Sequence, residues 1–381
     1  MAPRDEKPFN AAAEMGGSSD DSLLHGTMSV TRRVLTATDG QPVTVPGDTF
    51  LLQAEFLRQG DDLVLVGPDG TRVTVAGYFA LPSPPPLMSD AGAIIDGLLA
   101  TRLAGPLVPG QYAQAGGAGD SPVGRVEKVA GEVSVRHADG THGLLKVGDP
   151  LLEGDQIRTA PGSSVGVVLL DGSQVSLGEL SRLVMSELTY RSDLHQGDAT
   201  LDLLSGTMAF VSGDIAKTAP DAFAVRTPAV SIGVRGTAGG VSVTPAGGTS
   251  AVLLPEAGGT SGELSVGGLT INQPMQSVSV TTPGGPPSPP VTLTPAQVGQ
   301  QFGSALASLP SGSSSLDGGT LGPALQSQPP APGQGTTPPP SSPTGGDQTG
   351  QAGPSPTLAQ LTAMREAAVA EAVAAVAQIR A

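Results

Sequence analysis

The chain has 381 residues, a formal net charge of −15, 54 glycines and 36 prolines, and neither cysteine nor tryptophan. The negative charge and the scattered basic residues argue against a nucleic-acid partner, because phosphate backbones need basic stripes. Without cysteine the chain has no disulfides, thiolate metal sites or cysteine nucleophiles. With seven Phe and three Tyr, small aliphatic residues must form most of the core.

Residues 1–28 are small, polar and unpatterned, which predicts a flexible arm. Residues 29–80 predict a small β module. Gly67–Gly70 lies between two apolar runs and favours a hairpin turn. The runs that favour strands are Val43–Val45, Thr49–Leu52, Leu63–Val66 and Arg72–Val75.

Residues 81–120 predict a Pro-rich linker that contains a short helix. The prolines of Leu81–Pro86 remove backbone donors and favour an extended spacer. Ser89 is the predicted N-cap of a helix that runs to about Leu103. Its apolar face would hold Ile94, Ile95, Leu98 and Leu99.

Residues 121–280 predict the main domain, and the chain as a whole is expected to be mainly β. Short alternating apolar runs recur from Val123 to Val243 at intervals of roughly 8 to 12 residues, which is typical of a sandwich, barrel or β-roll. Residues 250–280 continue the pattern more weakly as late or edge strands. The turn signals at the tips are Asp139–Gly140, Gly148–Asp149, Gly154–Asp155 and Asp171–Gly172.

Residues 281–356 are rich in Pro, Gly and Ser, which predicts a disordered tail interrupted by a weak helical turn near Pro295–Leu309. Residues 357–381 predict an amphipathic helix with apolar residues at helical spacing. This helix could pair with a second copy, bind a partner or an export machine, or fray as a functionless terminus.

The central block carries five motifs that together resemble the FecR domain, a periplasmic module of iron-uptake anti-sigma regulators that also occurs in bacterial envelope and surface proteins. The resemblance implies a mainly β, FecR-like sandwich or β-roll. The motifs are Gly124–Val135, Leu151–Thr159, Leu170–Gly178, Leu204–Met208 and Val225–Thr237.

Three further segments, Tyr78–Phe79, Gln111–Ala115 and Met208–Lys217, resemble a subgroup at the N-terminus of large adhesin-like proteins. That resemblance implies type I, signal-peptide-independent export to the cell surface or envelope. The start of the chain lacks an apolar signal region, and no run is long enough for a membrane span, so the cytoplasm is the alternative location.

The residues of the motifs are expected to be structural rather than ligand-binding. Thr227–Pro228 fixes a bend, Gly236 permits an unusual backbone conformation, and Arg235 is expected to bind buried carbonyls. A ligand or partner site in this segment is the alternative. The full structural signature is Gly154, Asp155, Asp171, Gly172, Thr227, Pro228, Arg235, Gly236 and Thr237.

Catalytic, metal and cofactor sites are not expected. His195 with Asp193 and Asp198 could suggest a hydrolase triad, but no nucleophile elbow accompanies them. The Gly-Asp pairs could suggest calcium, but no calcium-loop pattern occurs, so turn chemistry is the preferred reading. The other histidines, His25, His137 and His142, lack zinc-ligand spacing.

The function predicted from these features is a non-enzymatic scaffold or interaction module of the bacterial cell surface or envelope. Its partner would be a protein or a cell-surface component, bound through sheet edges and loops. The alternative is a regulatory sensor that passes a signal to a transcription or transport partner.

Overall fold

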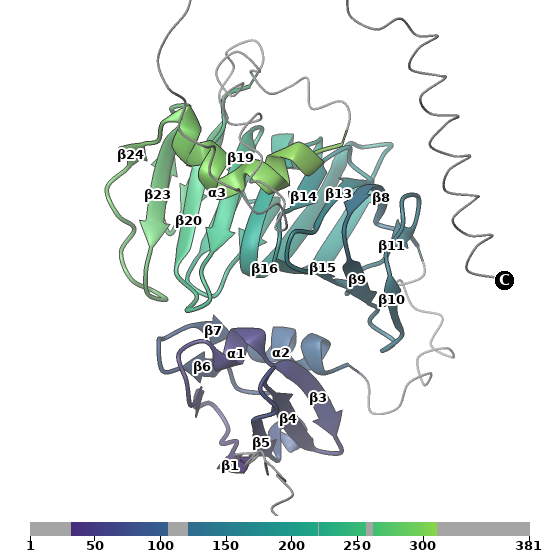
Figure 1. Ribbon diagram of the computed structural model, residues 1–381, viewed down its shortest axis with the longest axis vertical. Helices are drawn as coiled ribbons and strands as arrows, with labels where there is room; N and C mark the ends of the chain where they lie inside the picture. The colour runs from purple at the N-terminus through teal and green to yellow at the C-terminus, as the bar shows by residue number, and fades with distance from the viewer. Residues whose placement is uncertain (1–31, 106–120, 220, 257–261, 311–381) are drawn as a thin grey trace, which may run out of the picture. The chain divides into compact units, whose positions relative to one another are not determined.

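The structure is a computed structural model that describes residues 32–105, 121–219, 221–256 and 262–310 (Figure 1). Strands predominate in these residues, which confirms the prediction of a mainly β protein. The predicted arm, the segment Gln111–Ala115, the tail from residue 311 and the helix at 357–381 lie outside the described residues.

The N-terminal module begins with a four-stranded sheet in the order β1-β5-β4-β3, in which β1 and β5 are parallel. The hairpin predicted at Gly67–Gly70 joins β4 to β5. The Gly67 amide closes its turn by donating to the Thr71 carbonyl at 2.8 Å. The elements are β1 (Arg32–Thr36), β2 (Val43–Val45), α1 (Phe50–Gln53), β3 (Glu55–Gln59), β4 (Asp62–Val66), β5 (Arg72–Ala76) and the 3-10 helix η1 (Tyr78–Ala80).

The strand predicted at Thr49–Leu52 was wrong, since Phe50–Gln53 forms the helical turn α1. Leu51 and Leu52 are consecutive and both are buried, which a single helical turn permits and a strand covered on one face does not. A short apolar run lacks the period that separates the two structures.

Residues from 81 onward pack into the N-terminal module, where the sequence predicted a linker. They form β6 (Leu87–Ser89), β7 (Ile94–Ile95) and α2 (Gly97–Ala104), with β6 between β2 and β7 in a second sheet. The helix starts later than predicted, because Asp96 accepts from the Leu99 amide while Ser89 closes a turn with Ala93.

The core of the module explains why this segment does not act as a spacer. Leu87, Ile95 and Leu103 are each at most 1% exposed, beside Phe56 and Tyr78. The Tyr78 hydroxyl donates to the Pro85 carbonyl at 2.7 Å, which fixes the extended Pro-rich run against the core. Burial of these apolar side chains outweighs the local preference of the prolines for a spacer.

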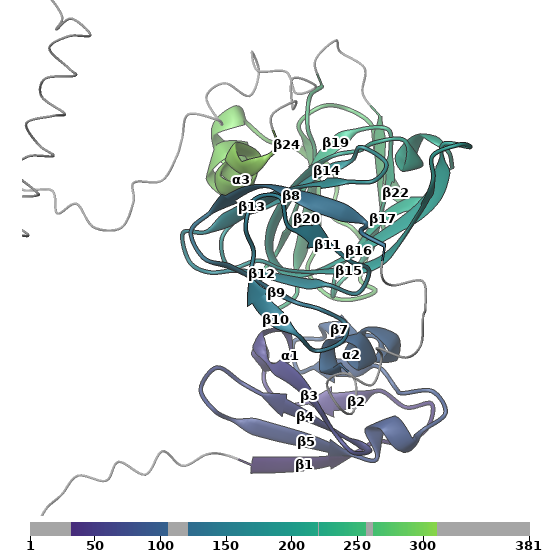
Figure 2. The ribbon, with the colours of Figure 1, turned by 90° about the vertical axis from the view of Figure 1, so that its right-hand side faces the viewer.

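The β domain consists of two sheets joined by one strand (Figures 1 and 2). Sheet I has the order β11-β8-β13-β14-β16-β19-β20-β23-β24 and sheet II the order β10-β9-β12-β15-β16-β17-β18-β21-β22. The strands are β8 (Gly124–Ala130), β9 (Val133–Arg136), β10 (His142–Leu144), β11 (Pro150–Leu151), β12 (Gln156–Thr159), β13 (Ser164–Leu169), β14 (Gln174–Leu177), β15 (Arg182–Arg191), β16 (Gln196–Val211), β17 (Phe223–Arg226), β18 (Ser231–Arg235), β19 (Ala238–Val243), β20 (Thr249–Leu253), β21 (Glu263–Val266), β22 (Leu269–Ile271), β23 (Gln276–Val280) and β24 (Val291–Thr292), with the 3-10 helix η3 (Ile215–Lys217) after β16.

The strand β16 belongs to both sheets. Its first half pairs with β15 and β17 in sheet II, and its second half pairs with β14 and β19 in sheet I. Gly206 has a φ of +84° near the crossing point, a conformation that glycine adopts readily. Residues 196–211 therefore form one bent strand that crosses from sheet II to sheet I.

The main core lies between the two sheets. Alternate residues of each strand point inward, so that Ile157, Leu183 and Leu201 of sheet II meet Val167 and Phe210 of sheet I in one buried cluster. The ring centroids of Phe210 and Phe223 are 6.0 Å apart. The outward-facing residues of the same strands are therefore available to pack against other parts of the chain.

A helix covers the outer face of sheet I, where the sequence predicted only a weak turn within a disordered tail. The helix α3 (Pro295–Ser308) buries Phe302 and Leu306 against Ala209 and Val252 of sheet I. Thr294 and Gln297 form a capping box at its start. The apolar spacing at 298, 302, 305 and 306 is the signal that the overall Pro and Gly content obscured.

The N-terminal module covers the outer face of sheet II. Val184 of β15 and Leu204 of β16 belong to the hydrophobic cluster of the module. Arg182, also on β15, donates hydrogen bonds to the carbonyls of Leu52 and Ala54 in the module. Among the described helices, none has the length and apolar character needed to cross a membrane.

Candidate functional site

The turn that joins β17 to β18 is organised by the Thr227 hydroxyl. This hydroxyl donates to the Val230 carbonyl at 2.8 Å and accepts from the Val230 amide at 3.1 Å. The Thr249 hydroxyl of β20 donates to the Thr227 hydroxyl oxygen at 2.7 Å, so β20 supports the turn from the side. Thr227 and Pro228, two of the signature residues, thus fix the shape of this hairpin.

Two distant segments bind the tip of the hairpin through backbone hydrogen bonds. The Ile94 amide of β7 donates to the Pro228 carbonyl at 3.2 Å, and the Gly284 amide donates to the Ala229 carbonyl at 3.3 Å. The N-terminal module and the segment after β23 therefore meet at the signature turn. The pocket between them is the candidate functional site.

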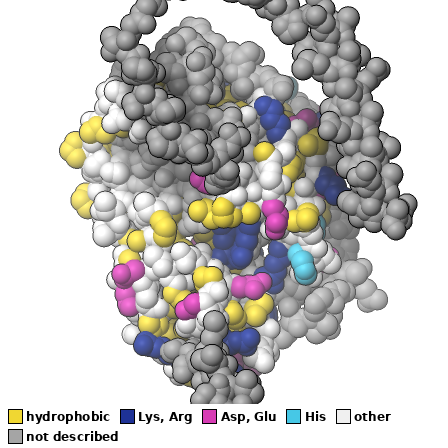
Figure 3. Space-filling model, viewed as in Figure 1, with side chains coloured by type: hydrophobic (Ala, Val, Ile, Leu, Met, Phe, Trp, Pro, Cys, Tyr) yellow, Lys and Arg dark blue, Asp and Glu magenta, His cyan; other side chains and the backbone are white. Residues whose placement is uncertain are grey.

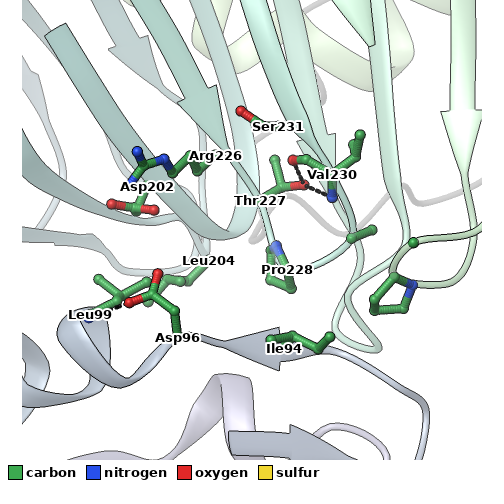
Figure 4. A pocket seen from close by; sticks show the side chains of 13 residues that line it. Ile94, Asp96, Leu99, Asp202, Leu204, Arg226, Thr227, Pro228, Val230 and Ser231 are labelled. Atoms are coloured by element: carbon green, nitrogen blue, oxygen red, sulfur yellow. Dashed lines mark hydrogen bonds between the residues drawn. The ribbon is translucent and has the colours of Figure 1, made fainter. Parts of the chain in front are cut away.

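The pocket has a volume of about 240 Å³. Figure 4 shows three charged side chains, Asp96, Asp202 and Arg226, on one side of the pocket, with Pro228 and Val230 on the other. Asp96 comes from the start of α2, Asp202 from β16 and Arg226 from the end of β17. Each therefore occupies a position fixed by regular secondary structure or by a helix cap.

The Asp202 carboxyl is buried, and its burial raises its pKa above the ordinary value of 3.8. A hydrogen bond from the Ser186 hydroxyl and the positive charge of Arg226 oppose this rise. Asp96 is already engaged, because one of its oxygens accepts from the Leu99 amide at 2.8 Å. The pocket thus combines one buried, partly compensated acid with a neighbouring guanidinium.

The hydroxyl groups of the pocket come from Thr227 and Ser231. The Thr227 hydroxyl is engaged in the turn. The volume is below the roughly 300–1,000 Å³ of most small-molecule sites, and fits one partner side chain. Within the described ranges, no group of three or more His, Asp or Glu residues could hold a metal ion.

The signature residues Asp155 and Asp171 lie elsewhere, in tight turns of the β domain. Asp155 is buried, accepts from the Leu152 amide at 2.8 Å and pairs with His137 Nδ1 at 2.7 Å. Asp171 accepts from the Ser173 amide and hydroxyl and from the Ile215 amide. The adjacent Gly154 and Gly172 have φ values of +86° and +82°.

The end of the signature runs from Arg235, the last residue of β18, to Thr237, and none of these three residues lines the pocket. Gly236 has a φ of +54°, and the Thr237 amide donates to the Ser212 hydroxyl at 2.8 Å. Arg235 was expected to bind buried carbonyls, but its guanidinium pairs with Glu263 on the surface at 3.0 Å. Its outward position in β18 explains this difference.

The structure joins His195 to Asp214 instead of the two nearby aspartates of the triad considered from sequence. His195 Nδ1 lies 3.0 Å from the Asp214 carboxylate, which also accepts from the Tyr190 hydroxyl at 3.0 Å. Both contacts lower the pKa of the Asp214 carboxyl, and the contact with His195 has the larger effect. Among the described hydrogen bonds of His195, none involves a serine hydroxyl.

Sequence reasoning missed Asp202 and Arg226. The run Leu201–Leu204 contains a single acid, and strand alternation assigns Asp202 to the face opposite the inward Leu201 and Leu203. Arg226 follows the inward Val225 in the same way. Alternation could have identified both as outward residues, but the pairing of β16 with β17 was needed to bring them together.

Comparison with known proteins gives a family match for the β domain. The model of the family described as FecR protein matches residues 155–256, which lie inside the domain predicted at 121–280. No curated protein matches the chain. The adhesin-like subgroup is not supported by these comparisons and stays a prediction.

Two solved structures are similar to parts of the chain. A cell surface anchoring domain has 32% identity and a TM-score of 0.16, with 16% of this chain and 82% of that chain covered. A candidate anti-sigma factor from Parabacteroides distasonis ATCC 8503 has 17% identity and a TM-score of 0.26. That match covers 35% of this chain and 57% of the anti-sigma factor structure, so it spans just over half of that protein's length.

Proposed function

We propose that the chain, in which residues 155–256 match the family model described as FecR protein, is a non-enzymatic regulatory sensor module that acts by binding other proteins. The binding surface for a partner is the pocket at the Thr227–Val230 turn, because the N-terminal module already covers the outer face of sheet II. A signal would be passed by contact with a transcription or transport partner, without chemical turnover.

The observation that carries the proposal is the way sheet II holds the N-terminal module. Arg136 donates to the carbonyls of Leu103 and Ala104, and Arg182 donates to those of Leu52 and Ala54. Sheet II thus recognises a neighbouring folded unit through its backbone at two helix ends. A surface built in this way is suited to protein recognition, since arginine presents several donors in a fixed geometry.

The pocket lies where the N-terminal module meets the β domain, so a partner could bind at this contact. It is lined by residues of both the module and the β domain, including Ile94 and Asp202, so an inserted side chain would touch both. The proposal therefore assigns the pocket to an apolar or basic side chain of the partner. The buried Asp202 disfavours an acidic one.

Affinity capture with the tagged full chain from its native host tests this function. Ile94→Glu would place a third carboxylate in the pocket, and we expect it to abolish capture of the specific partner. Leu98→Glu is the matched control, because Leu98 is exposed on α2 and does not line the pocket. Capture that Ile94→Glu leaves unchanged would contradict the role of the pocket.

The identity of the captured partner separates the sensor from the second candidate, a scaffold of the cell surface or envelope. A transcription regulator or transport protein supports the sensor. Cell-surface polysaccharide or outer-membrane components would support the scaffold. Fractionation of the host tests the proposed envelope location, and recovery only in the cytosol would contradict it.

A further inference from the structure

A second, larger pocket lies at the other end of sheet II, with a volume of about 490 Å³, which is within the usual range of small-molecule sites. Strands β9, β10 and β12 form its floor, and β3 of the N-terminal module forms one wall. Figure 3 shows basic side chains gathered in one part of this face beside a histidine, with acidic and apolar side chains next to them. The Thr227–Val230 turn does not line this pocket, so it is a separate site.

The floor of the pocket is lowest at Ser134, because the strand register places this small side chain between two large ones. Ser134 of β9 pairs with Leu144 of β10 on one side and with Arg158 of β12 on the other. All three residues line the pocket. Neighbouring strands are about 4.8 Å apart, so the backbones of Leu144 and Arg158 are separated by about 10 Å. A small molecule placed over Ser134 therefore has an apolar side chain at one end and a guanidinium at the other.

The position of Arg158, rather than its unpaired donors alone, makes it the cationic group of the pocket. Its Nε donates to the Gln156 side chain at 3.2 Å, and its two terminal nitrogens have no hydrogen-bond partner among the described residues. Arg136 also lines the pocket, but its terminal nitrogens donate to carbonyls of the N-terminal module. Arg182, opposite Arg158 on β15, has an unpartnered Nη2 as well, but that atom is buried and Arg182 does not line the pocket.

An acidic side chain enters the pocket from the N-terminal module. Glu55 and Leu57 of β3 both line it, because strand alternation puts them on the face opposite the buried Phe56. Burial lowers the pKa of the Arg158 guanidinium, and the negative charge of Glu55 opposes this effect, so the two charges interact. Among the ion pairs of the described residues, however, none includes Glu55 or Arg158. The pocket thus contains a positive and a negative group that are near each other but unpaired.

We propose that this pocket binds a free amino acid with an apolar side chain, which places its α-carboxylate on Arg158 and its α-ammonium on Glu55. Such a ligand is a zwitterion and complements both charges, whereas a simple anion is repelled by Glu55 and a simple cation by Arg158. The planar fork of arginine matches the two oxygens of a carboxylate. Leu57 and Leu144, both exposed in the pocket, contact the apolar side chain of the ligand. The inference concerns a different site from the proposed function and does not depend on it.

Titration of the full chain with free leucine, methionine and phenylalanine in turn, followed by isothermal titration calorimetry at low salt, tests the proposal. We expect saturable binding of at least one of them. Because the ligand binds the folded chain, the melting temperature should rise with its concentration. If none of the three amino acids binds, the proposal is overturned.

Derivatives of leucine test the two charges of the ligand. N-acetyl-leucine keeps the carboxylate and lacks the ammonium, and leucinamide keeps the ammonium and lacks the carboxylate. Each should bind at least about tenfold more weakly than leucine. Binding of N-acetyl-leucine or of free acetate as tight as that of leucine would overturn the proposal in favour of a simple anion.

Protein variants assign each charge to one side chain. Arg158→Gln and Glu55→Gln should each weaken leucine binding about tenfold or more, and Arg158→Lys should recover only part of the loss, because lysine lacks the fork. Glu55→Gln should also remove the preference for leucine over N-acetyl-leucine. Arg125→Gln removes a guanidinium from an exposed position on β8 and should have no effect. Unchanged leucine binding by a folded Arg158→Gln or Glu55→Gln protein would overturn the assignment.

A larger side chain at Ser134 tests where the ligand lies. Ser134→Leu fills the floor of the pocket and should abolish binding. Ser265→Leu adds the same bulk at a half-buried position of β21 outside the pocket, and should leave binding unchanged. Circular dichroism confirms that both variants are folded. Leucine binding retained by a folded Ser134→Leu protein would overturn the placement over Ser134.

Discussion

The Arg182 guanidinium of β15 donates a hydrogen bond of 2.9 Å to the backbone carbonyl of Ala54, a residue 128 positions earlier in the chain. Arg182 is almost fully buried, and its Nε also donates to the Gln156 side chain. One side chain thus joins the β domain to the end of α1. Its burial lowers the pKa of the guanidinium well below its ordinary value.

Replacing Arg182 with Ala is expected to lower the free energy of unfolding by about 2–4 kcal/mol, since it opens a cavity and leaves two buried carbonyls unpaired. Arg182→Lys should recover little of this loss, because an ammonium group cannot reproduce the fork. Urea unfolding measures both variants. The control is Arg125→Ala, an exposed surface pair, which should change stability by at most about 0.5 kcal/mol. If Arg182→Ala lost as little stability as the Arg125→Ala control, the prediction would be contradicted.

The helix α3 should stabilise the β domain. Phe302 is fully buried against the outer face of sheet I, so Phe302→Ala is expected to cost about 3–5 kcal/mol. Gln300→Ala changes an exposed position of the same helix and should be nearly neutral. Thermal unfolding followed by circular dichroism compares them. Equal melting temperatures would indicate that α3 does not pack on sheet I.

Asp202 should make stability depend on pH. Because burial raises its folded pKa above the ordinary value of 3.8, the folded state holds the proton more tightly than the unfolded chain. This contribution to stability is full below about pH 4 and is lost as the pH rises through the folded pKa. Asp202→Asn removes the titration, so the variant should gain stability relative to the wild type by up to about 1.4 kcal/mol per pH unit in that window. Urea unfolding from acid to neutral pH measures the free energy of unfolding of both proteins. The same pH dependence in the two proteins would contradict the prediction.

Gly97 allows the Pro-rich run to approach α2. A Cβ atom built on Gly97 would lie 1.8 Å from the Pro84 carbonyl oxygen, so Gly97→Ala should destabilise the N-terminal module despite the better helix propensity of alanine. Gly143→Ala is the control, because no atom lies within 4 Å of its added Cβ. Hydrogen exchange of residues 32–105 measures the effect. Equal protection in both variants would mean that residues 81–105 do not pack as described.

Local patterns predicted much of the β domain. The alternation and turn signals predicted the strand-rich stretch from Val123 to Val243, and the motif order predicted the match of residues 155–256 to the FecR family model, because both depend on neighbouring residues. Alternation could also have assigned Arg136, Arg158, Arg182 and Asp202 to outward faces of strands, but the sequence analysis did not single them out. Composition failed for residues 81–104 and 295–309, where a high content of Pro and Gly obscured short amphipathic segments.

The sequence by itself determined the mainly β character, the FecR motifs and the direction in which each strand side chain points, since these follow from backbone periodicity. Only the tertiary structure decided what covers each face. Sheet pairing brings the three arginines together from separate strands, the N-terminal module covers sheet II, and α3 covers sheet I. Those contacts join residues far apart in the chain, and their energy depends on burial and geometry that no local pattern encodes.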